Sequence, residues 1–268
     1  MTLSISGKTA IVTGAAHGIG RAIARHFVDR GANVMFADTD EDALERDLGD
    51  EANAEGAVRW FGGDLCKKLT INNLLSATLD AFDRVDVLVN AHRSIVLSDP
   101  LCLETDGVEE MVQQNLMTSL RLSQHVAKRM VAQADKAGDA GPAGSIINLS
   151  SIAARLTHPE LLGYSMACAG IEQMTRSMAV ALAPQRIRVN CVAFGSVMSA
   201  SLQASLKDHA DWRDEIRRGT PAGRIAAPLE LAETVQFLAS DGAGFVTGQV
   251  LTVDGGRSLI DPVRLPAH

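Results

Sequence analysis

Glycine residues gather where a first apolar run ends and a helical pattern begins, at Gly14, Gly18 and Gly20. Glycines let a backbone turn tightly and approach a pyrophosphate, and the N–H groups and dipole of a helix start offset the negative charge of that group. Three glycines can also form an ordinary strand–helix turn, but the strand before them and the helix after them favour dinucleotide binding. We therefore predict cofactor contacts at Gly14, His17, Gly18, Ile19 and Gly20.

An acidic residue ends the second apolar run. Asp38 follows Gly20 by 18 residues, a position from which a carboxylate accepts hydrogen bonds from the adenosine ribose hydroxyls and repels a 2′-phosphate. The alternative is that Asp38 only caps the helix that starts near Asp40. His17 can become cationic near neutral pH, but it is a weaker phosphate ligand than arginine. The sequence thus predicts NAD rather than NADP as the cofactor.

Apolar, β-rich runs alternate with segments of helical period along the whole chain. The runs are Thr9–Val12, Asn33–Ala37, Ala57–Phe61, Val85–Val89, Ser145–Leu149, Arg188–Ala193 and Val250–Val253. The helical segments are Ile19–Arg30, Asp40–Asn53, Lys67–Asp83, Asp106–Asp135, Leu162–Leu182 and Leu229–Ser240. Short apolar strands separated by helices indicate a parallel sheet covered on both faces. We predict one α/β domain over residues 1–268, a three-layer, doubly wound Rossmann-type sheet of about seven parallel strands with helices on both faces.

Two segments depart from this alternation. Ala134–Gly144 contains three glycines and one proline, which predicts a surface loop inserted before a strand. Met198–Thr220 has helical patterning without a strand attached. It suits either a flap over a site, at about 198–220, or a plain pair of surface helices.

The composition excludes several classes of protein. Lys and Arg number 25 against 32 Asp and Glu, a net charge of −7, and no basic cluster offers a surface for nucleic acid. We expect no membrane contact, because no apolar run approaches the roughly 18 residues of a spanning helix, and residues 1–8 lack the layout of a secretory signal. The four cysteines are widely scattered, which predicts reduced thiols in a cytoplasmic protein without a metal site. They are Cys66, Cys102, Cys168 and Cys191.

The ordered motifs of the chain resemble the short-chain dehydrogenase/reductase family from about Lys8 to Gly256. The markers are the glycine segment at 13–20, Asp64, Asp86-Val87-Leu88-Val89-Asn90, Asn115, Ser150–Ala153, Tyr164, Arg188-Val189-Asn190 and the segment 246–256. The resemblance implies a nicotinamide cofactor and further cofactor contacts. We expect these contacts at Asp64, Leu65, Asn90, Tyr164, Gly195 and Val197.

The same resemblance implies catalytic roles. Family members usually use Asn, Ser, Tyr and Lys to move a hydride between nicotinamide and an alcohol or carbonyl carbon. Ser151, which precedes Tyr164 by 13 residues, is expected to orient the substrate oxygen, and Ser150 to be a neighbouring structural hydroxyl. Tyr164, the only tyrosine in the chain, is expected to be the general acid/base. Asn115 is expected to hold a water or a backbone group in the proton relay.

Cys168 stands where the family pattern Tyr-x-x-x-Lys has its lysine. That lysine binds the nicotinamide ribose and lowers the pKa of the tyrosine through its charge. Cys168 shares a helix face with Tyr164 but supplies neither the charge nor three donors. Proton transfer is therefore expected to be weakened or unconventional.

Two other segments differ from the family pattern. Ala91-His92-Arg93 follows Asn90 in place of Asn-Ala-Gly, and Phe194-Gly195 replaces Pro-Gly. Arg93 remains charged and offers several donors, so it can replace the lost cation. It can instead block the pocket or pair with a surface acid.

These observations favour an NAD-dependent oxidoreductase of the short-chain type that acts on a secondary alcohol or ketone. The second hypothesis is a catalytically silent NAD-binding protein that senses the cofactor or forms an oligomer surface. The third is a lyase or isomerase on the same scaffold. Tyr164 and Ser151 favour the enzyme, whereas Cys168 and Arg93 favour the catalytically silent NAD-binding protein. By resemblance we expect a homo-oligomer, a tetramer or dimer, and a small-molecule substrate.

Overall fold

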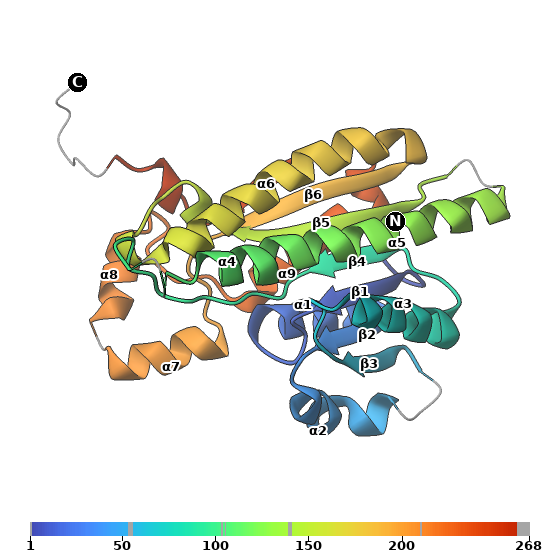
Figure 1. Ribbon diagram of the computed structural model, residues 1–268, viewed down its shortest axis with the longest axis horizontal. Coiled ribbons are helices and arrows are strands. Elements are labelled where there is room, and N and C mark those ends of the chain that lie inside the picture. The colour runs from blue at the N-terminus through green and yellow to red at the C-terminus, as the bar shows by residue number, and fades with distance from the viewer. Residues whose placement is uncertain are drawn as a thin grey trace.

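A parallel sheet forms the centre of the molecule (Figure 1). The computed structural model describes residues 2–52, 56–102, 104, 106–138, 141–209 and 211–261. Within them the strands are β1 (Thr9–Thr13), β2 (Asn33–Asp38), β3 (Val58–Gly62), β4 (Val87–Asn90), β5 (Gly144–Ser151), β6 (Ile187–Phe194) and β7 (Val250–Val253). Their order across the sheet is β3-β2-β1-β4-β5-β6-β7, and every neighbouring pair is parallel. The predicted Rossmann-type sheet is confirmed.

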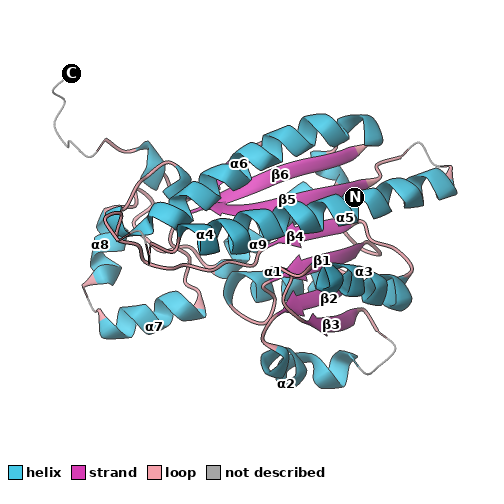
Figure 2. Cartoon of the chain, viewed as in Figure 1, coloured by secondary structure: helices cyan, strands magenta, loops and turns pink. Residues whose placement is uncertain are grey.

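Helices cover both faces of the sheet (Figure 2). The α-helices formed by the described residues are α1 (Gly18–Asp29), α2 (Glu41–Ala52), α3 (Lys68–Phe82), α4 (Val108–Met111), α5 (Thr118–Ala137), α6 (Leu162–Leu182), α7 (Ala200–Asp208), α8 (Trp212–Arg218) and α9 (Pro228–Ala239). Val12 of β1 packs in one core with α1, α2 and α9, whereas its neighbour Ile11 packs in a second core with α3, α5 and α6. Because successive side chains of a strand point to opposite faces, an uninterrupted apolar strand needs helices on both sides.

The strand order reverses beside β1, which pairs with β2 on one side and with β4 on the other. Crossovers that leave in opposite directions separate the loops that follow β1 and β4. A crevice therefore forms outside the carboxyl ends of these two strands, where open α/β sheets bind ligands.

The prediction of one continuous helix over Asp106–Asp135 is wrong. A π-helical turn, Val112–Met117, separates α4 from α5. The wider turn places the buried side chain of Asn115 against the loop that follows β4, where it exchanges two hydrogen bonds with the backbone of Ser94. A regular helical period in the sequence contains no sign of this contact, because Ser94 is distant along the chain.

The loop expected over Ala134–Gly144 begins later than predicted. Helix α5 continues to Ala137 and ends at Gly138, whose φ of +63° is the left-handed conformation that often terminates helices. Asp139 and Ala140 lie outside the described residues, as does Asn53, the last residue of an expected helix. The segment 198–220 forms the helix pair α7 and α8.

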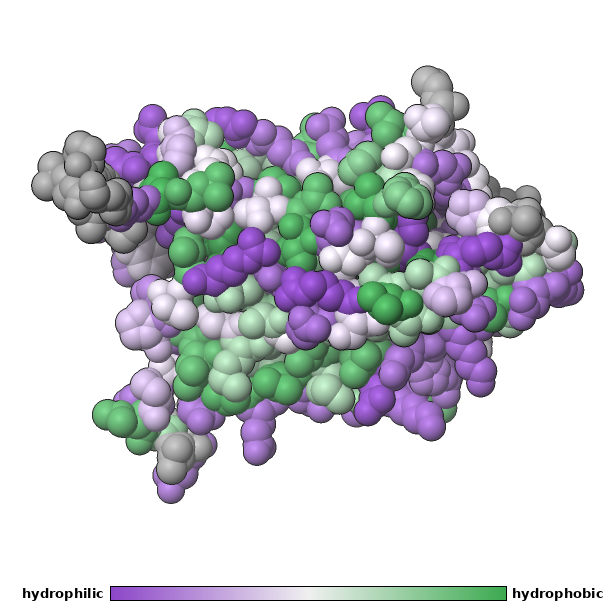
Figure 3. Space-filling model, turned by 90° about the horizontal axis from the view of Figure 1, so that it is seen from above, coloured by the Kyte–Doolittle hydropathy of each residue, from purple (hydrophilic) through white to green (hydrophobic). Residues whose placement is uncertain are grey.

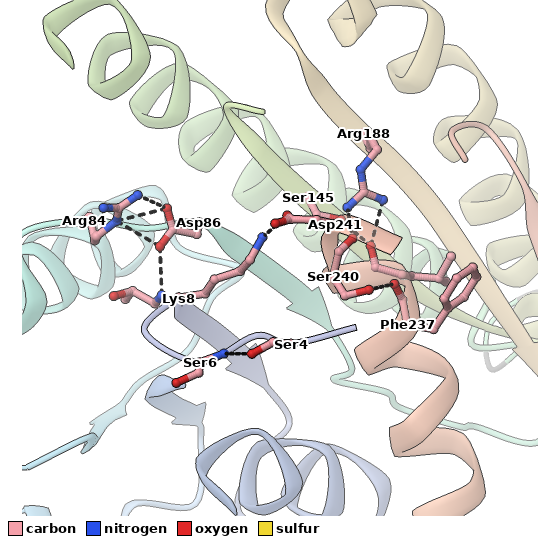
Figure 4. Close-up of polar contacts among 12 residues, drawn as sticks. Ser4, Ser6, Lys8, Arg84, Asp86, Ser145, Arg188, Phe237, Ser240 and Asp241 are labelled. Carbon is pink, nitrogen blue, oxygen red and sulfur yellow. Dashed lines mark hydrogen bonds and ion pairs between the residues drawn. The ribbon is translucent and has the colours of Figure 1, made fainter. Parts of the chain in front are cut away.

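Polar contacts tie together the amino ends of the strands, opposite the crevice (Figure 4). Lys8 Nζ lies 2.7 Å from Asp241 Oδ1 in the turn after α9. Arg188 of β6 donates to the backbone oxygen of Ser240 at 3.1 Å. Asp86, ahead of β4, accepts a hydrogen bond from the first N–H of β1 at 2.9 Å. These contacts join β1, β4 and β6 at one edge, whereas the opposite edge of the sheet carries the cavity described below.

The described residues lack the features of two other classes of protein. None of their helices combines the length and the apolar character needed to cross a membrane. Among the same residues, no group of three or more His, Cys, Asp and Glu side chains is arranged to hold a metal ion.

Candidate active site

A cavity of about 760 Å³ lies at the carboxyl edge of the sheet. It extends from the loop between β1 and α1 to the start of α6. Ten residues predicted from the sequence line it together. They are Gly14, His17, Gly18, Ile19, Gly20, Asp38, Asp64, Leu65, Asn115 and Tyr164.

The glycine loop forms one end of the cavity. Gly14 has a φ of +65°, and a Cβ built on it would lie 2.7 Å from the Cα of His92. Only glycine allows the loops after β1 and β4 to approach so closely. The N-cap of α1 is His17, whose side chain makes no capping hydrogen bond, and the first turn of α1 contains no acidic residue. The partial positive charge at this helix start is therefore suited to an anion.

Asp38 ends β2 at the rim of the cavity. Its carboxylate accepts backbone hydrogen bonds from Ala16 at 2.9 Å and from Thr39 at 2.7 Å. The cap of α2 is instead Asp40, whose Oδ1 accepts from the N–H of Ala43 at 3.0 Å. The alternative that Asp38 only caps this helix is therefore wrong. Oδ1 accepts from the N–H groups of both Thr39 and Asp40, whereas Oδ2 accepts only from Ala16 among the described residues, so Oδ2 retains an acceptor position for a ligand.

His17 makes its side-chain hydrogen bond with Asp40. Its Nε2 lies 2.7 Å from Asp40 Oδ2, and this hydrogen bond is the main reason why the pKa of Asp40 is lowered. Both side chains are solvent-exposed. The imidazole thus lines the cavity while it is bound to a carboxylate.

Asp64 and Leu65 follow β3 and line the same region of the cavity. Asp64 Oδ1 accepts from the N–H of Cys66 at 2.9 Å, and this bond is the main cause of the lowered pKa of Asp64. Cys66 Sγ lies 3.3 Å from the hydroxyl of Thr118. Burial raises the pKa of the Cys66 thiol.

Tyr164 lies in the first turn of α6, at the other end of the cavity, and is 3% exposed. It packs with Ala153 and with Cys168, one turn further along the helix. Burial raises the pKa of Tyr164 to about 12, although the charge of Arg93 and a hydrogen bond with Ser151 lower it; Cys168 raises it further. Burial also raises the pKa of the Cys168 thiol. The phenol and the thiol are accordingly both neutral near pH 7.

The two serines at the end of β5 differ in position. Ser150 lines the cavity, and its hydroxyl donates to the backbone oxygen of Cys168 at 3.2 Å. Ser151 Oγ accepts from the N–H of Ala153 at 3.1 Å and caps a short 3₁₀ turn. Ser151 is beside Tyr164 without lining the cavity itself.

Arg93 extends from the loop after β4 toward Tyr164. Its Nη1 donates to the phenolic oxygen at a distance of 3.4 Å. The centre of the guanidinium lies 5.9 Å from the ring centroid of Tyr164 and 5.3 Å from that of Phe194, the last residue of β6. No carboxylate in the described part of the chain forms an ion pair with it. The hypothesis that Arg93 pairs with a surface acid is therefore not borne out there.

Asn115 and His92 hold the loop that carries Arg93. Asn115 Oδ1 accepts from the N–H of Ser94 at 2.8 Å, and its Nδ2 donates to the Ser94 oxygen at 2.9 Å. The ring nitrogens of His92 lie 2.7 Å from the Thr13 hydroxyl and 3.3 Å from the Ser119 hydroxyl. Burial lowers the pKa of His92 to about 4. A neutral imidazole can donate through one nitrogen and accept through the other, as this pair of contacts requires.

Four predicted residues lie outside the cavity lining. Asn90 is buried and donates to the hydroxyl of Ser123 and to the side-chain oxygen of Asn148. Val197 bridges to Ala226 through the backbone. The others are Gly195 and Ser151.

Other polar residues that line the cavity were not singled out from the sequence. They are Thr39, His92, Ser94, Glu110, Gln113, Gln114, Thr118, Ser199 and Ser201. The sequence marks His92 as a departure from the family pattern but does not indicate a role for it. Ser199 is the N-cap of α7 and Ser201 lies in its first turn, in a segment whose only sequence signal is its helical pattern. Nothing local in the sequence indicates that these residues meet.

A model of the family described as enoyl-(acyl carrier protein) reductase matches residues 14–258. An L-rhamnose 1-dehydrogenase (NAD(P)⁺) of Sphingomonas sp. is 34% identical over 254 residues, which cover 94% of this chain and 96% of that relative. The chain belongs to the short-chain dehydrogenase/reductase family. A second member, a 3-oxoacyl-(acyl-carrier-protein) reductase of Thermotoga maritima, is 30% identical over 95% of this chain and 99% of its own.

Solved structures of short-chain dehydrogenases agree with this assignment. A gluconate 5-dehydrogenase of Burkholderia cenocepacia, in complex with NADP and tartrate, has a TM-score of 0.85 and 27% identity, and the match covers 97% of this chain and 98% of that one. A short-chain type dehydrogenase/reductase of Mycobacterium marinum has a TM-score of 0.84 and 26% identity over 96% and 97% of the two chains. The chain is accordingly an oxidoreductase of the short-chain dehydrogenase/reductase family.

Proposed function

We propose that this short-chain dehydrogenase is a single-domain oxidoreductase over residues 1–268, prefers NAD to NADP, and acts on a secondary alcohol or ketone. One observation carries the proposal. The glycine loop, the Asp38 carboxylate and the Tyr164 phenol line a single cavity of about 760 Å³. That space suits an extended dinucleotide with a small substrate beside its reactive end.

The residues present fit a nicotinamide dinucleotide. The loop closed by Gly14 and the uncapped start of α1 would hold the pyrophosphate, Asp38 the adenosine ribose, and Asp64 with Leu65 the adenine end. When bound, the nicotinamide accepts a hydride from the carbinol carbon or returns one to the carbonyl carbon.

Tyr164 handles the proton in the proposed mechanism. During oxidation, the ionised phenol oxygen takes the proton of the substrate hydroxyl as the carbinol carbon loses its hydride. During reduction, the neutral phenol returns that proton to the carbonyl oxygen. Ser151 orients the substrate oxygen beside Tyr164, and Asn115 holds the adjoining loop in place through Ser94. We thus propose Tyr164, Ser151 and Asn115 as the catalytic residues.

The charges around Asp38 support a preference for NAD. None of the described residues that line the cavity beside Asp38 is a lysine or arginine. The nearby arginines of α1 are bound to α2, because Arg21 pairs with Asp47, and Arg25 lies 2.7 Å from Glu51. Within the described cavity lining, a 2′-phosphate at Asp38 would therefore meet a carboxylate and neither a lysine nor an arginine.

The deciding experiment combines binding with turnover. NADH binding is titrated by calorimetry, and NADH formation is then screened across secondary alcohols at several pH values, with the Tyr164→Phe variant as control. Turnover that disappears in the variant supports the enzyme. Tight NADH binding without turnover on any alcohol or ketone would favour the catalytically silent NAD-binding protein. Two observations favour that second candidate: the raised pKa of Tyr164 and the neutral thiol of Cys168 beside it.

We also propose a homo-oligomer, a tetramer or dimer, in the cytoplasm. On the side of the molecule where α6 lies, apolar residues gather in patches between hydrophilic ones (Figure 3). Met166 and Val180 of α6 are 50% and 79% exposed, which supports an association surface. Cys66, Cys168 and Cys191 are free thiols, as a reducing compartment allows. Light scattering of the parent and of Val180→Asp tests the assembly.

A further inference from the structure

The phenolic oxygen of Tyr164 has one cationic neighbour. Arg93 Nη1 donates to it at 3.4 Å, and Arg93 is the sole lysine or arginine among the described residues that line the cavity. We propose that Arg93 is a catalytic residue whose guanidinium supplies the positive charge that stabilises the ionised Tyr164 oxygen. The inference rests on the proposed function, because it assigns a group that touches the reacting atom of that reaction.

The other groups that face Tyr164 are neutral near pH 7. Its own helix presents Cys168, a thiol whose pKa burial raises. The end of β5 presents the hydroxyl of Ser151, and the phenyl ring of Phe194 in β6 contacts the guanidinium of Arg93 without adding a charge. Cys168 does not lower the pKa of Tyr164 but raises it. Among the described residues, the stabilising charge therefore comes from the loop after β4.

The surroundings of Arg93 hold its guanidinium in this position. It lies against the aromatic rings of Tyr164 and Phe194, at 5.9 Å and 5.3 Å from their centroids, which are distances typical of cation–π contacts. The residues on either side of it are bound to different elements: His92 to Thr13 of β1, and Ser94 to Asn115 of the π turn. The loop is thus fixed on both sides of the charged residue.

Arginine is chemically suited to this role. It stays protonated throughout the range in which a tyrosine titrates, and its planar group can contact two rings and an oxygen at once. An opposite charge within about 4–6 Å lowers the pKa of an acid by roughly 1–3 units. Removal of the charge is expected to raise the pKa of Tyr164 by about 1 unit or more.

The chain allows a direct measurement, because Tyr164 is its only tyrosine. The ultraviolet absorbance of the phenolate, followed as pH is raised, reports this residue without interference from another tyrosine and needs neither cofactor nor substrate. The parent is compared with Arg93→Gln, which removes the charge but keeps an N–H donor, and with Arg93→Met, which removes both. The matched control is Arg121→Gln, on the exposed face of α5. Circular dichroism at each pH verifies that the protein is folded.

We expect Arg93→Gln and Arg93→Met to titrate at higher pH than the parent, and Arg121→Gln to titrate close to it. A parent-like titration of Arg93→Gln would overturn the proposal. So would a shift confined to Arg93→Met, since a lost donor rather than a lost charge would then be the cause. If Arg93→Gln unfolds at alkaline pH, Arg93→Met provides the same comparison with the parent and with Arg121→Gln. Absence of turnover on every alcohol would contradict the proposed function but leave this titration unaffected.

Discussion

His92 Nδ1 lies 2.7 Å from the hydroxyl oxygen of Thr13, so that the loop after β4 is bound to the last residue of β1. The same hydroxyl accepts the backbone N–H groups of Ala91 at 3.0 Å and of His92 at 3.2 Å. The glycine loop follows Thr13, and Arg93 follows His92. These contacts therefore hold the loop that carries Arg93 against the start of the glycine loop.

His92 is expected to make the protein sensitive to mild acid. Burial lowers its pKa from 6.5 to about 4, so the unfolded chain gains a proton below about pH 6.5 that the folded protein does not accept until about pH 4. The stability due to the neutral imidazole is present above pH 6.5 and is lost as pH falls toward 4, by at most about 3 kcal/mol. Urea unfolding at pH 7 and at pH 4.5 should show a smaller loss in His92→Asn than in the parent. An identical loss in both proteins would contradict this role.

Asp38 is expected to determine the choice of cofactor. The parent should bind NADH more tightly than NADPH, and Asp38→Ala should narrow the difference, because a close like-charge pair costs a few kcal/mol, or roughly 10²-fold in affinity. Calorimetric titration of both cofactors measures the ratio. The control is Asp42→Ala, an exposed acid of α2 outside the cavity lining. Equal or tighter binding of NADPH by the parent would refute the prediction.

Tyr164→Phe tests the general acid/base. The variant keeps the ring that packs against Ala153 and Cys168 but loses the ionisable oxygen. NADH affinity is expected to persist, while turnover of a verified alcohol falls by about 10²–10⁴-fold. Steady-state kinetics alongside NADH titration separate the two effects. Oxidation at the parent rate by the phenylalanine variant would show that another group transfers the proton.

Cys168→Lys tests the altered motif. Because the pKa of Tyr164 is raised to about 12, the ionised form is scarce at neutral pH, and oxidation by the parent should accelerate as pH climbs toward 10. A lysine on the same helix face adds a positive charge and should lower the pKa of the tyrosine. The pH–rate profile of the variant is expected to shift to lower pH, with faster turnover near pH 7. If the parent is already at its maximum near neutrality, Tyr164 does not limit the reaction through its protonation.

Local patterns were sufficient to predict much of the fold. Leu162–Leu182 is a helix with the predicted bounds, and Val250–Val253 is a strand with the predicted bounds. These elements could be recognised because burial on a helix or strand repeats with a fixed period, which a short stretch of sequence records. The π turn around Asn115 was not recognised, since one added residue in a helical turn leaves the periodicity on either side almost unchanged.

The sequence by itself determined the parallel α/β architecture, the glycine loop, the acid at the end of β2 and the single tyrosine. Only the tertiary structure decided what surrounds that tyrosine. Arg93 and Tyr164 are 71 residues apart, and His92 and Thr13 are 79 apart, so their contacts depend on how β1, β4 and α6 pack together. The burial that raises the pKa of Tyr164 has the same origin. The effect of a charge or of burial on a pKa depends on distances in space, and the separation of two residues along the chain does not give those distances.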